Sequence, residues 1–332
     1  MLNIFKNKAK EQTVVQRVEN VIIPEAKNVV IPKFRQPTFT IAVGKKNIGK
    51  TFTTKKKAKE YVKGNALTGT NPRKVLYFDI NNESKDIKTI PVNSVFNPKE
   101  INWIAVFSSP RTKVEIRRVI PIKKNGSPMN NRELNDVLAY IIKYFKGGLL
   151  VVEDPTKYIS DAIDTDLAGG LATIRHANCD VIAHFQWKSK ALNPKLFGNV
   201  NYFRLHKTND DFIDYIDRVK GVKQIFFLAE TLERYMNKIL RENATQKQLD
   251  NEKQIPIETF YCIIDMDSTK IRGAFSVNDF KKAVELYLSS NSKKELQPLL
   301  KEINVNTGKP KYLFQEAYNI KFNQLFKEYF GN

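Results

Sequence analysis

The segment from Phe39 to Val62, FTIAVGKKNIGKTFTTKKKAKEYV, constrains the fold more than any other part of the sequence. The apolar, β-branched residues over 38–43 predict a buried strand, and the pattern over 51–63, which ends before Gly64, predicts a helix. Residues 44–51 between them match G-x-x-x-x-G-K-[ST], in which glycines let a loop turn its backbone N–H groups around phosphate oxygens. A preceding strand and a following helix are the context that such a phosphate-binding loop requires.

Further apolar runs alternate with helical patterns along the next part of the chain. Helical spacing of apolar residues is found over 131–145, and a second helical stretch is expected over 163–175. Strands that alternate with helices predict an α/β fold with a mostly parallel central sheet and helices on both faces. The runs expected to be strands lie at residues 74–80, 101–107, 149–152, 179–186 and 200–206.

We expect one α/β domain with appendages. Prolines and paired β-branched residues near the N-terminus indicate an extended arm, and the polar segment after residue 207 reads most simply as an insertion. The expected parts are an extended basic N-terminal arm (1–36), a P-loop core (37–207), a mainly helical insertion (208–255), strands that return to the core (256–276) and a helical C-terminal region (277–332).

The net charge of +20 favours a polyanionic partner such as nucleic acid or an anionic membrane face, although solubility in a lysine-rich protein explains it equally well. Residues 1–74 carry 17 Lys or Arg against 4 Asp or Glu. The longest apolar runs fall far below the ~20 residues of a membrane span. The first residues, MLNIFKNKAKEQ, carry lysines where a secretory signal has its apolar segment, so export by that route is not expected. Two cysteines, Cys179 and Cys262, exclude a disulfide framework, so a reducing cytoplasm fits best.

The loop predicts ATP and Mg²⁺ as cofactors. Lys50 is expected to bridge the β- and γ-phosphates, and the hydroxyl of Thr51 is expected to bind Mg²⁺. A chance match in a lysine-rich chain is the alternative, and the flanking strand and helix argue against it. The residues predicted to contact the nucleotide are Gly44, Lys45, Lys46, Asn47, Ile48, Gly49, Lys50, Thr51 and Phe52.

Two acids follow the apolar run LLVV, at Glu153 and Asp154. Ligands of parallel sheets bind at the carboxyl ends of the strands, which is where these acids are expected to lie. One carboxylate would bind Mg²⁺, with Glu153 the predicted metal ligand beside Thr51, and the other would polarise the attacking water. The sequence leaves the division of these roles open, and an acidic turn before a proline is the alternative.

These residues together resemble the FtsK–HerA superfamily of P-loop ATPases, ring-forming DNA pumps that include viral genome-packaging ATPases. The resemblance covers about residues 38–207 and implies a RecA/FtsK-like fold. It also implies a polar sensor at the end of the strand after the acidic one, here Gln186, and an arginine near the start of that strand that serves the neighbouring subunit, here Arg175. The matching segments are VGKKNIGKT, VLYFDINNE, LLVVED and IRHANCDVIAHFQ.

For both the sensor and the arginine that the resemblance implies, the residues themselves leave alternatives. Gln186 ends an apolar strand and could align water beside the γ-phosphate, or it could simply mark the strand exit. For the arginine, three other residues are equally available to a neighbouring subunit, namely Arg117, Arg118 and Arg204.

One feature departs from the family, which usually ends its acidic strand Asp-Glu whereas this chain reads Glu-Asp. Three histidines, at positions 176, 184 and 206, lack ligand spacing and are interpreted as structural or polar-network residues. Lysines 55, 56, 57 and 59 are interpreted as a solvated helix face rather than a binding patch. The C-terminal aromatic residues have helical spacing, which favours a packed amphipathic helix over a base-stacking surface.

Three functions are compatible with these observations. The first is an ATP-hydrolysing, DNA-stimulated translocase, a viral genome-packaging ATPase that forms a homo-oligomeric ring, grips DNA of any sequence through its phosphates and docks on a capsid vertex or a membrane-anchored partner. It would work in the host cytoplasm or with the virion. The second is an assembly or secretion ATPase docked through a partner, and the third is a nucleotide-binding structural or switch protein that does not hydrolyse.

Overall fold

The computed structural model describes residues 36–65, 70–90, 101–123, 125–155, 170, 174–219, 221–250 and 259–331. Residues 36–332 cluster as one unit. The expected N-terminal arm, apart from Gln36, and most of the expected helix over 163–175 lie outside the described residues.

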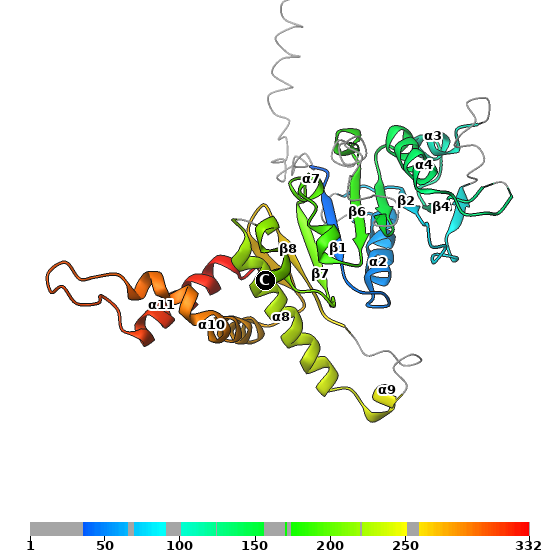
Figure 1. Cartoon of the computed structure of the whole chain (residues 1–332). Helices are drawn as coiled ribbons and strands as arrows, with labels where there is room; N and C mark the ends of the chain where they lie inside the picture. Colours follow the sequence, from blue (N-terminus) through cyan, green and yellow to red (C-terminus); the bar gives the residue numbers. More distant parts are fainter. Residues whose placement is uncertain are drawn as a thin grey trace, which may run out of the picture. The chain divides into compact units, whose positions relative to one another are not determined.

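The described strands form one nine-stranded sheet in the order β3-β4-β2-β5-β6-β1-β7-β8-β9 (Figure 1). Strands β1 to β7 pair in parallel, and only β8 and β9 run antiparallel to their neighbours. The predicted mostly parallel α/β fold is therefore confirmed. The strands are β1 (Phe39–Val43), β2 (Val75–Phe78), β3 (Lys88–Ile90), β4 (Ile116–Val119), β5 (Leu149–Val152), β6 (Asp180–Phe185), β7 (Tyr202–His206), β8 (Tyr261–Asp265) and β9 (Lys270–Gly273).

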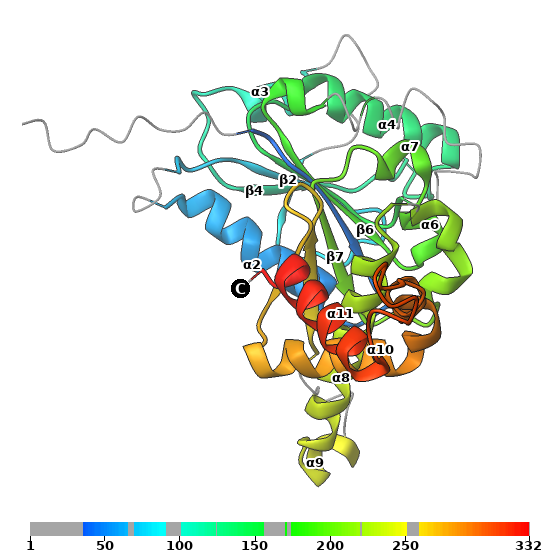
Figure 2. The ribbon, with the colours of Figure 1, turned by 90° about the vertical axis from the view of Figure 1, so that its left-hand side faces the viewer.

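The central strands are buried on both faces, which explains their unbroken apolar runs. Alternate residues enter two cores: Leu149 and Val151 pack with Ala58 of one helix, whereas Leu150 and Val152 join the larger core on the other face. Figure 2 shows α2 (Lys50–Lys63) on one side of the strands and α3 (Trp103–Ser108) and α4 (Asn131–Tyr144) on the other. The prediction of helices on both faces is confirmed.

The rest of the described secondary structure is helical. The helices are α2 (Lys50–Lys63), α3 (Trp103–Ser108), α4 (Asn131–Tyr144), α6 (Lys188–Ala191), α7 (Pro194–Phe197), α8 (Lys223–Glu242), α9 (Gln246–Asp250), α10 (Val277–Leu300) and α11 (Phe314–Tyr329), with 3-10 helices η4 (Ile174–Ala177) and η5 (Phe212–Val219). Within these described elements, no helix has both the length and the apolar character that a membrane crossing requires.

The strand predicted over 101–107 is wrong, because α3 occupies this segment. Asn102 caps the helix by accepting a hydrogen bond of 3.0 Å from the backbone N–H of Ala105. Ile104 and Phe107, three residues apart, are buried in the core. Short apolar runs fit a strand or a buried helix equally well, and here the cap and the three-residue spacing decide.

The segment after residue 207 contributes to the core through α8. This helix contacts β7 and β8, and its buried residues include Phe226 and Leu228. Helix α10 contacts both α8 and α11. The aromatic residues Phe326 and Phe330 of the C-terminal segment pack against Phe280 of α10, as expected for the apolar side of an amphipathic helix.

Candidate functional site

The loop after β1 favours glycine at two positions, for different physical reasons. At Gly44, an added Cβ would lie 2.7 Å from the Cβ of His206, so no larger residue fits. Gly49 precedes α2 with φ 84° and ψ 6°, in the left-handed region that glycine enters without cost. The loop is tied to the neighbouring strands because Gly44 N donates to Phe185 O (3.1 Å) and Lys45 N donates to Lys207 O (2.9 Å).

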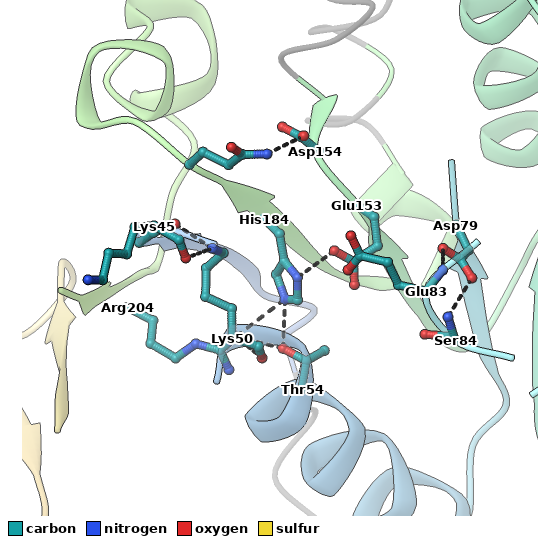
Figure 3. A network of polar contacts seen from close by, with 12 residues as sticks. Lys45, Lys50, Thr54, Asp79, Glu83, Ser84, Glu153, Asp154, His184 and Arg204 are labelled. Carbon is teal, nitrogen blue, oxygen red and sulfur yellow. Dashed lines mark hydrogen bonds and ion pairs between the residues drawn. The ribbon is translucent and has the colours of Figure 1, made fainter. Parts of the chain in front are cut away.

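Lys50, in the first turn of α2, folds back over this loop (Figure 3). Its Nζ donates to the carbonyl oxygens of Gly44 and, at 2.7 Å, of Lys45. Burial lowers the pKa of Lys50 to about 8, although the charges of Glu153 and Asp154 oppose the shift. An anion in front of the loop would therefore find an ammonium group already held in place.

A cavity of about 260 Å³ opens in front of the loop, at the carboxyl-terminal edge of the parallel strands. Most of the predicted site residues line it together, although they come from three separate segments of the chain. Gly44 and Lys45 do not line the cavity and instead anchor Lys50. The lining residues are Lys46, Asn47, Ile48, Gly49, Lys50, Thr51, Phe52, Asn81, Glu83, Glu153, Asp154, His184 and Gln186.

Glu153 is buried at the end of β5, with 5% of its surface exposed. Its Oε2 lies 2.9 Å from Nδ1 of His184, whereas its Oε1 is buried and has no hydrogen-bond partner among the described residues. Burial works to raise the pKa of Glu153, but His184, Lys50 and Arg204 outweigh it, and the pKa lies below its ordinary value. The carboxylate is thus charged and presents one free oxygen.

Asp154 has different partners although it is the next residue. Its backbone adopts φ 45°, a left-handed conformation that is uncommon for a residue other than glycine. Its Oδ2 accepts a hydrogen bond of 2.5 Å from Nε2 of Gln186, which follows β6. The structure therefore separates the two acids that the sequence leaves equivalent.

Two buried residues contact the site although the sequence did not assign them to it. His184, interpreted as a structural or polar-network residue, lines the cavity and contacts Glu153 and, through Nε2 at 2.7 Å, Oγ1 of Thr54. Arg204 on β7 donates to the same Oγ1 at 2.6 Å. Burial lowers the pKa of Arg204 to about 10. A buried polar residue within an apolar strand, such as His184 in DVIAHF, was the available signal.

Glu83 is a third carboxylate on the cavity that was not predicted. It belongs to the loop after β2, where Oδ1 of Asp79 accepts from its backbone N–H at 3.0 Å and Oδ2 of Asp79 accepts from Ser84 N at 2.9 Å (Figure 3). Arg118 neutralises the buried Asp79 through an ion pair of 2.9 Å. The segment VLYFDINNE contained this signal, because its acids follow a buried strand.

The candidate arginines differ in how accessible they are. Arg175 lies in η4, before the amino-terminal end of β6, and its side chain is outside the described part of the chain. Arg118 and Arg204 are 7% and 5% exposed, so the interpretation that they are available to a neighbouring subunit is wrong. Arg117 is partly exposed and pairs with Glu115 at 2.7 Å.

The donor set fits Mg²⁺ when a nucleotide completes it. Thr51 and Glu153 both line the cavity, and Oε1 of Glu153 is a buried oxygen without a partner. No three His, Cys, Asp or Glu side chains of the described residues are grouped so that they could hold an ion by themselves. Mg²⁺ commonly binds through one or two protein oxygens plus phosphates and water, as this arrangement would allow.

The chain matches no protein-family model, and no curated protein matches it. Among solved structures it is similar to the genome packaging NTPase B204 from Sulfolobus turreted icosahedral virus 2 in complex with ATP-gammaS, with 14% identity over 72% of this chain and 96% of that one and a TM-score of 0.42. It is also similar to the DNA-packaging ATPase from Sulfolobus Turreted Icosahedral Virus (12%, 72% and 97%, TM-score 0.40). A third similar structure is the N-terminal domain of zonular occludens toxin from Neisseria meningitidis (14%, 55% and 91%, TM-score 0.30).

Proposed function

We propose that this protein is an ATPase that uses Mg²⁺ and drives the movement of DNA, as a genome-packaging motor does. The observation that carries the proposal is the shared cavity, which brings a phosphate-binding loop, two separately held carboxylates and a glutamine to one edge of the sheet. The order of these groups along the chain is that of the ring-forming DNA pumps that the sequence resembles.

Each group of the cavity has a role in phosphoryl transfer to water. The backbone N–H groups of residues 44–51 and the ammonium of Lys50 bind and orient the phosphates. Thr51 and Glu153 would hold Mg²⁺, which neutralises charge on the β- and γ-phosphate oxygens when bound. Asp154 accepts a proton from the attacking water, and Gln186, already bonded to Asp154, orients that water.

DNA is the proposed polymer because the chain is strongly basic and a motor must grip any sequence. Contacts with phosphates are independent of sequence and weaken steeply as salt rises. We infer a homo-oligomeric ring, with an arginine such as Arg175 supplied to the neighbouring subunit's nucleotide, where it would stabilise transition-state charge.

The test is ATP hydrolysis by the purified full chain with and without DNA, compared with Lys50→Ala. We expect hydrolysis that DNA stimulates, that falls with added salt and that Lys50→Ala abolishes. A rate that Lys50→Ala leaves unchanged would refute the ATPase proposal. Hydrolysis that responds to lipid vesicles but not to DNA would instead select the docked assembly ATPase, and nucleotide binding without turnover would select the switch protein.

A further inference from the structure

We propose that His184 is a positioning residue: it fixes the carboxylate of Glu153 against the helix that carries Lys50 and Thr51, so that only Oε1 is left to bind the nucleotide's metal ion. This inference rests on the proposed function and assigns a specific role to a residue that the sequence indicated only as structural or as part of a polar network.

The sheet register brings the contributing residues together. Ala42 of β1 pairs with His184 on one side and with Arg204 on the other, so the three residues form one row across three parallel strands. Paired residues of neighbouring strands point to the same face, and Ala42 belongs to the core that includes Ala58 of α2. Two long polar side chains therefore flank a methyl group on the face that α2 covers, where Thr54 meets both of them.

The hydrogen-bond directions in this row are set by the groups at its two ends. Arg204 can only donate, and its Nη2 donates to Oγ1 of Thr54 at 2.6 Å. The same Nη2 lies 3.4 Å from Nε2 of His184, which favours Nε2 as the acceptor of the Thr54 hydroxyl at 2.7 Å. At the other end, the ionised carboxylate of Glu153 can only accept, so Nδ1 of His184 carries a hydrogen and donates it to Oε2 at 2.9 Å.

As a consequence of these hydrogen bonds, one oxygen of the Glu153 carboxylate is bonded and the other is free. Oε2 of Glu153 is occupied, whereas the buried Oε1 has no partner in the described structure and belongs to a residue that lines the cavity. Thr54 lies three residues after Thr51 and four after Lys50, so all three share a side of α2. The bonds from Thr54 to His184 and from His184 to Glu153 thereby fix both expected metal ligands relative to one helix.

A histidine that was buried there for structural reasons alone would make the same contacts. The test must therefore separate the hydrogen bond of His184 to Glu153 from its hydrogen bond to Thr54. In His184→Asn the side-chain amide can take the place of Nδ1 and keep the bond to Glu153, whereas in His184→Gln it can reach the place of Nε2 and keep only the bond to Thr54. His176→Gln, at an exposed histidine that does not line this cavity, is the matched control.

The primary readout is the affinity of the nucleotide-bound protein for Mn²⁺, titrated by electron paramagnetic resonance, alongside ATP affinity without metal and thermal melting. We expect His184→Gln to weaken ion binding about 10- to 100-fold, as is usual for groups that orient a ligand, and His184→Asn to weaken it only a few-fold. Metal-free ATP affinity should be unchanged in both, and His176→Gln should match the wild type. Equal losses in the Asn and Gln variants, or unchanged ion affinity in both, would overturn the proposal.

The second readout is made on the wild-type protein, and His184→Gln serves only to assign its signals. Nitrogen-15 NMR of the imidazoles should show a hydrogen on Nδ1 of His184. A ring whose only hydrogen is on Nε2 would overturn the proposal, because Nδ1 could not then donate to Glu153. If the wild type binds ATP but does not hydrolyse it, the proposed function fails, while the ion titration and the tautomer still decide the role of His184.

Discussion

Nε2 of Gln186 donates a hydrogen bond of 2.5 Å to Oδ2 of Asp154, joining the residues that follow the neighbouring parallel strands β5 and β6. Asp154 holds φ 45°, so its backbone leaves the strand direction at the point where its carboxylate meets the glutamine. Glu153, one residue earlier, is bonded to His184 instead. The two adjacent acids thus have different hydrogen-bond partners, and the unusual backbone of Asp154 accompanies that difference.

The first prediction separates the charge of Asp154 from its backbone conformation. Asn tolerates the left-handed region at least as well as Asp, whereas Ala in that region costs about 1–2 kcal/mol. Asp154→Asn should therefore lower the hydrolysis rate about 100-fold or more by removing the base, with little change in the free energy of unfolding. Asp154→Ala should show both losses. Rate measurements and urea denaturation of the two variants check this, and hydrolysis by Asp154→Asn at the wild-type rate would contradict the assigned role.

The second prediction concerns the close approach of the phosphate loop to β7. A Cβ at position 44 would lie 2.7 Å from His206 Cβ and 3.3 Å from the carbonyl oxygen of Lys207. Gly44→Ala should destabilise the protein by about 1–3 kcal/mol, because backbone atoms must move to relieve the contact, and it should displace the loop and weaken ATP binding.

The matched control is Gly198→Ala, where the added Cβ would meet only the carbonyl oxygen of Pro194 at an ordinary 3.6 Å. This variant should have nearly the wild-type free energy of unfolding in urea denaturation and nearly the wild-type ATP affinity in isothermal titration calorimetry. If the two variants lost equal stability and equal ATP affinity, the close approach of Gly44 to His206 would not be what restricts position 44 to glycine.

The main features of the fold were predictable because the central strands are buried on both faces and read as unbroken apolar runs, such as LLVV before Glu153. The edge strand β3 and its neighbour β4 were missed, because KTI in β3 is short and IRRV in β4 places arginines within the run. Arg118 fits there only because Asp79, at the end of β2, neutralises it. That pairing depends on strand order, which a local pattern does not contain.

The site residues likewise divide into those that a local sequence pattern predicts and those that depend on how the strands pair. The loop and the two acids follow from local patterns, because each comes directly after an apolar run. The contact of His184 with Glu153 depends on strands 149–152 and 180–185 lying side by side in one register, with Val152 opposite Ala183. The buried row of His184, Ala42 and Arg204 likewise spans three strands that are far apart in sequence. A single histidine in an apolar run indicates burial but not its partner.

The third prediction is a dependence of stability on pH that originates at Glu233 of α8. Burial raises its pKa from 4.5 to about 7, although Lys188, Arg234 and a hydrogen bond of 2.5 Å from Asn237 oppose the shift. The folded protein therefore binds this proton more tightly than the unfolded chain. The stabilisation is fully present below about pH 4.5 and is lost as pH rises through 7, by up to about 3 kcal/mol.

Glu233→Gln keeps an oxygen for Asn237 but cannot ionise, so it isolates this contribution. Urea unfolding of the wild type and the variant at several pH values between 5 and 8 should show a free energy of unfolding that falls less with pH in the variant. Parallel curves for the two proteins would exclude Glu233 as the source of the dependence.

The fourth prediction concerns the buried ion pair between Lys188 and Glu230, which links the segment after Gln186 to α8. Lys188 is 2% exposed, and its Nζ also donates to the carbonyl oxygen of Asp210 at 2.5 Å and lies 4.4 Å from the ring centroid of Phe212. Removing one member of a buried pair leaves the other charge uncompensated and typically costs about 3–5 kcal/mol.

The two single substitutions should differ because the partners are unequally supported. Without Lys188, Glu230 keeps the backbone N–H of Phe212 at 3.2 Å and Arg234 at 3.4 Å. Without Glu230, no other carboxylate of the described residues forms an ion pair with the ammonium. We expect Glu230→Leu to destabilise the protein more than Lys188→Met, and the double variant to be less destabilised than the sum of the two. Denaturant unfolding of all four proteins measures the coupling, and additive losses would show that the pair contributes as two independent side chains.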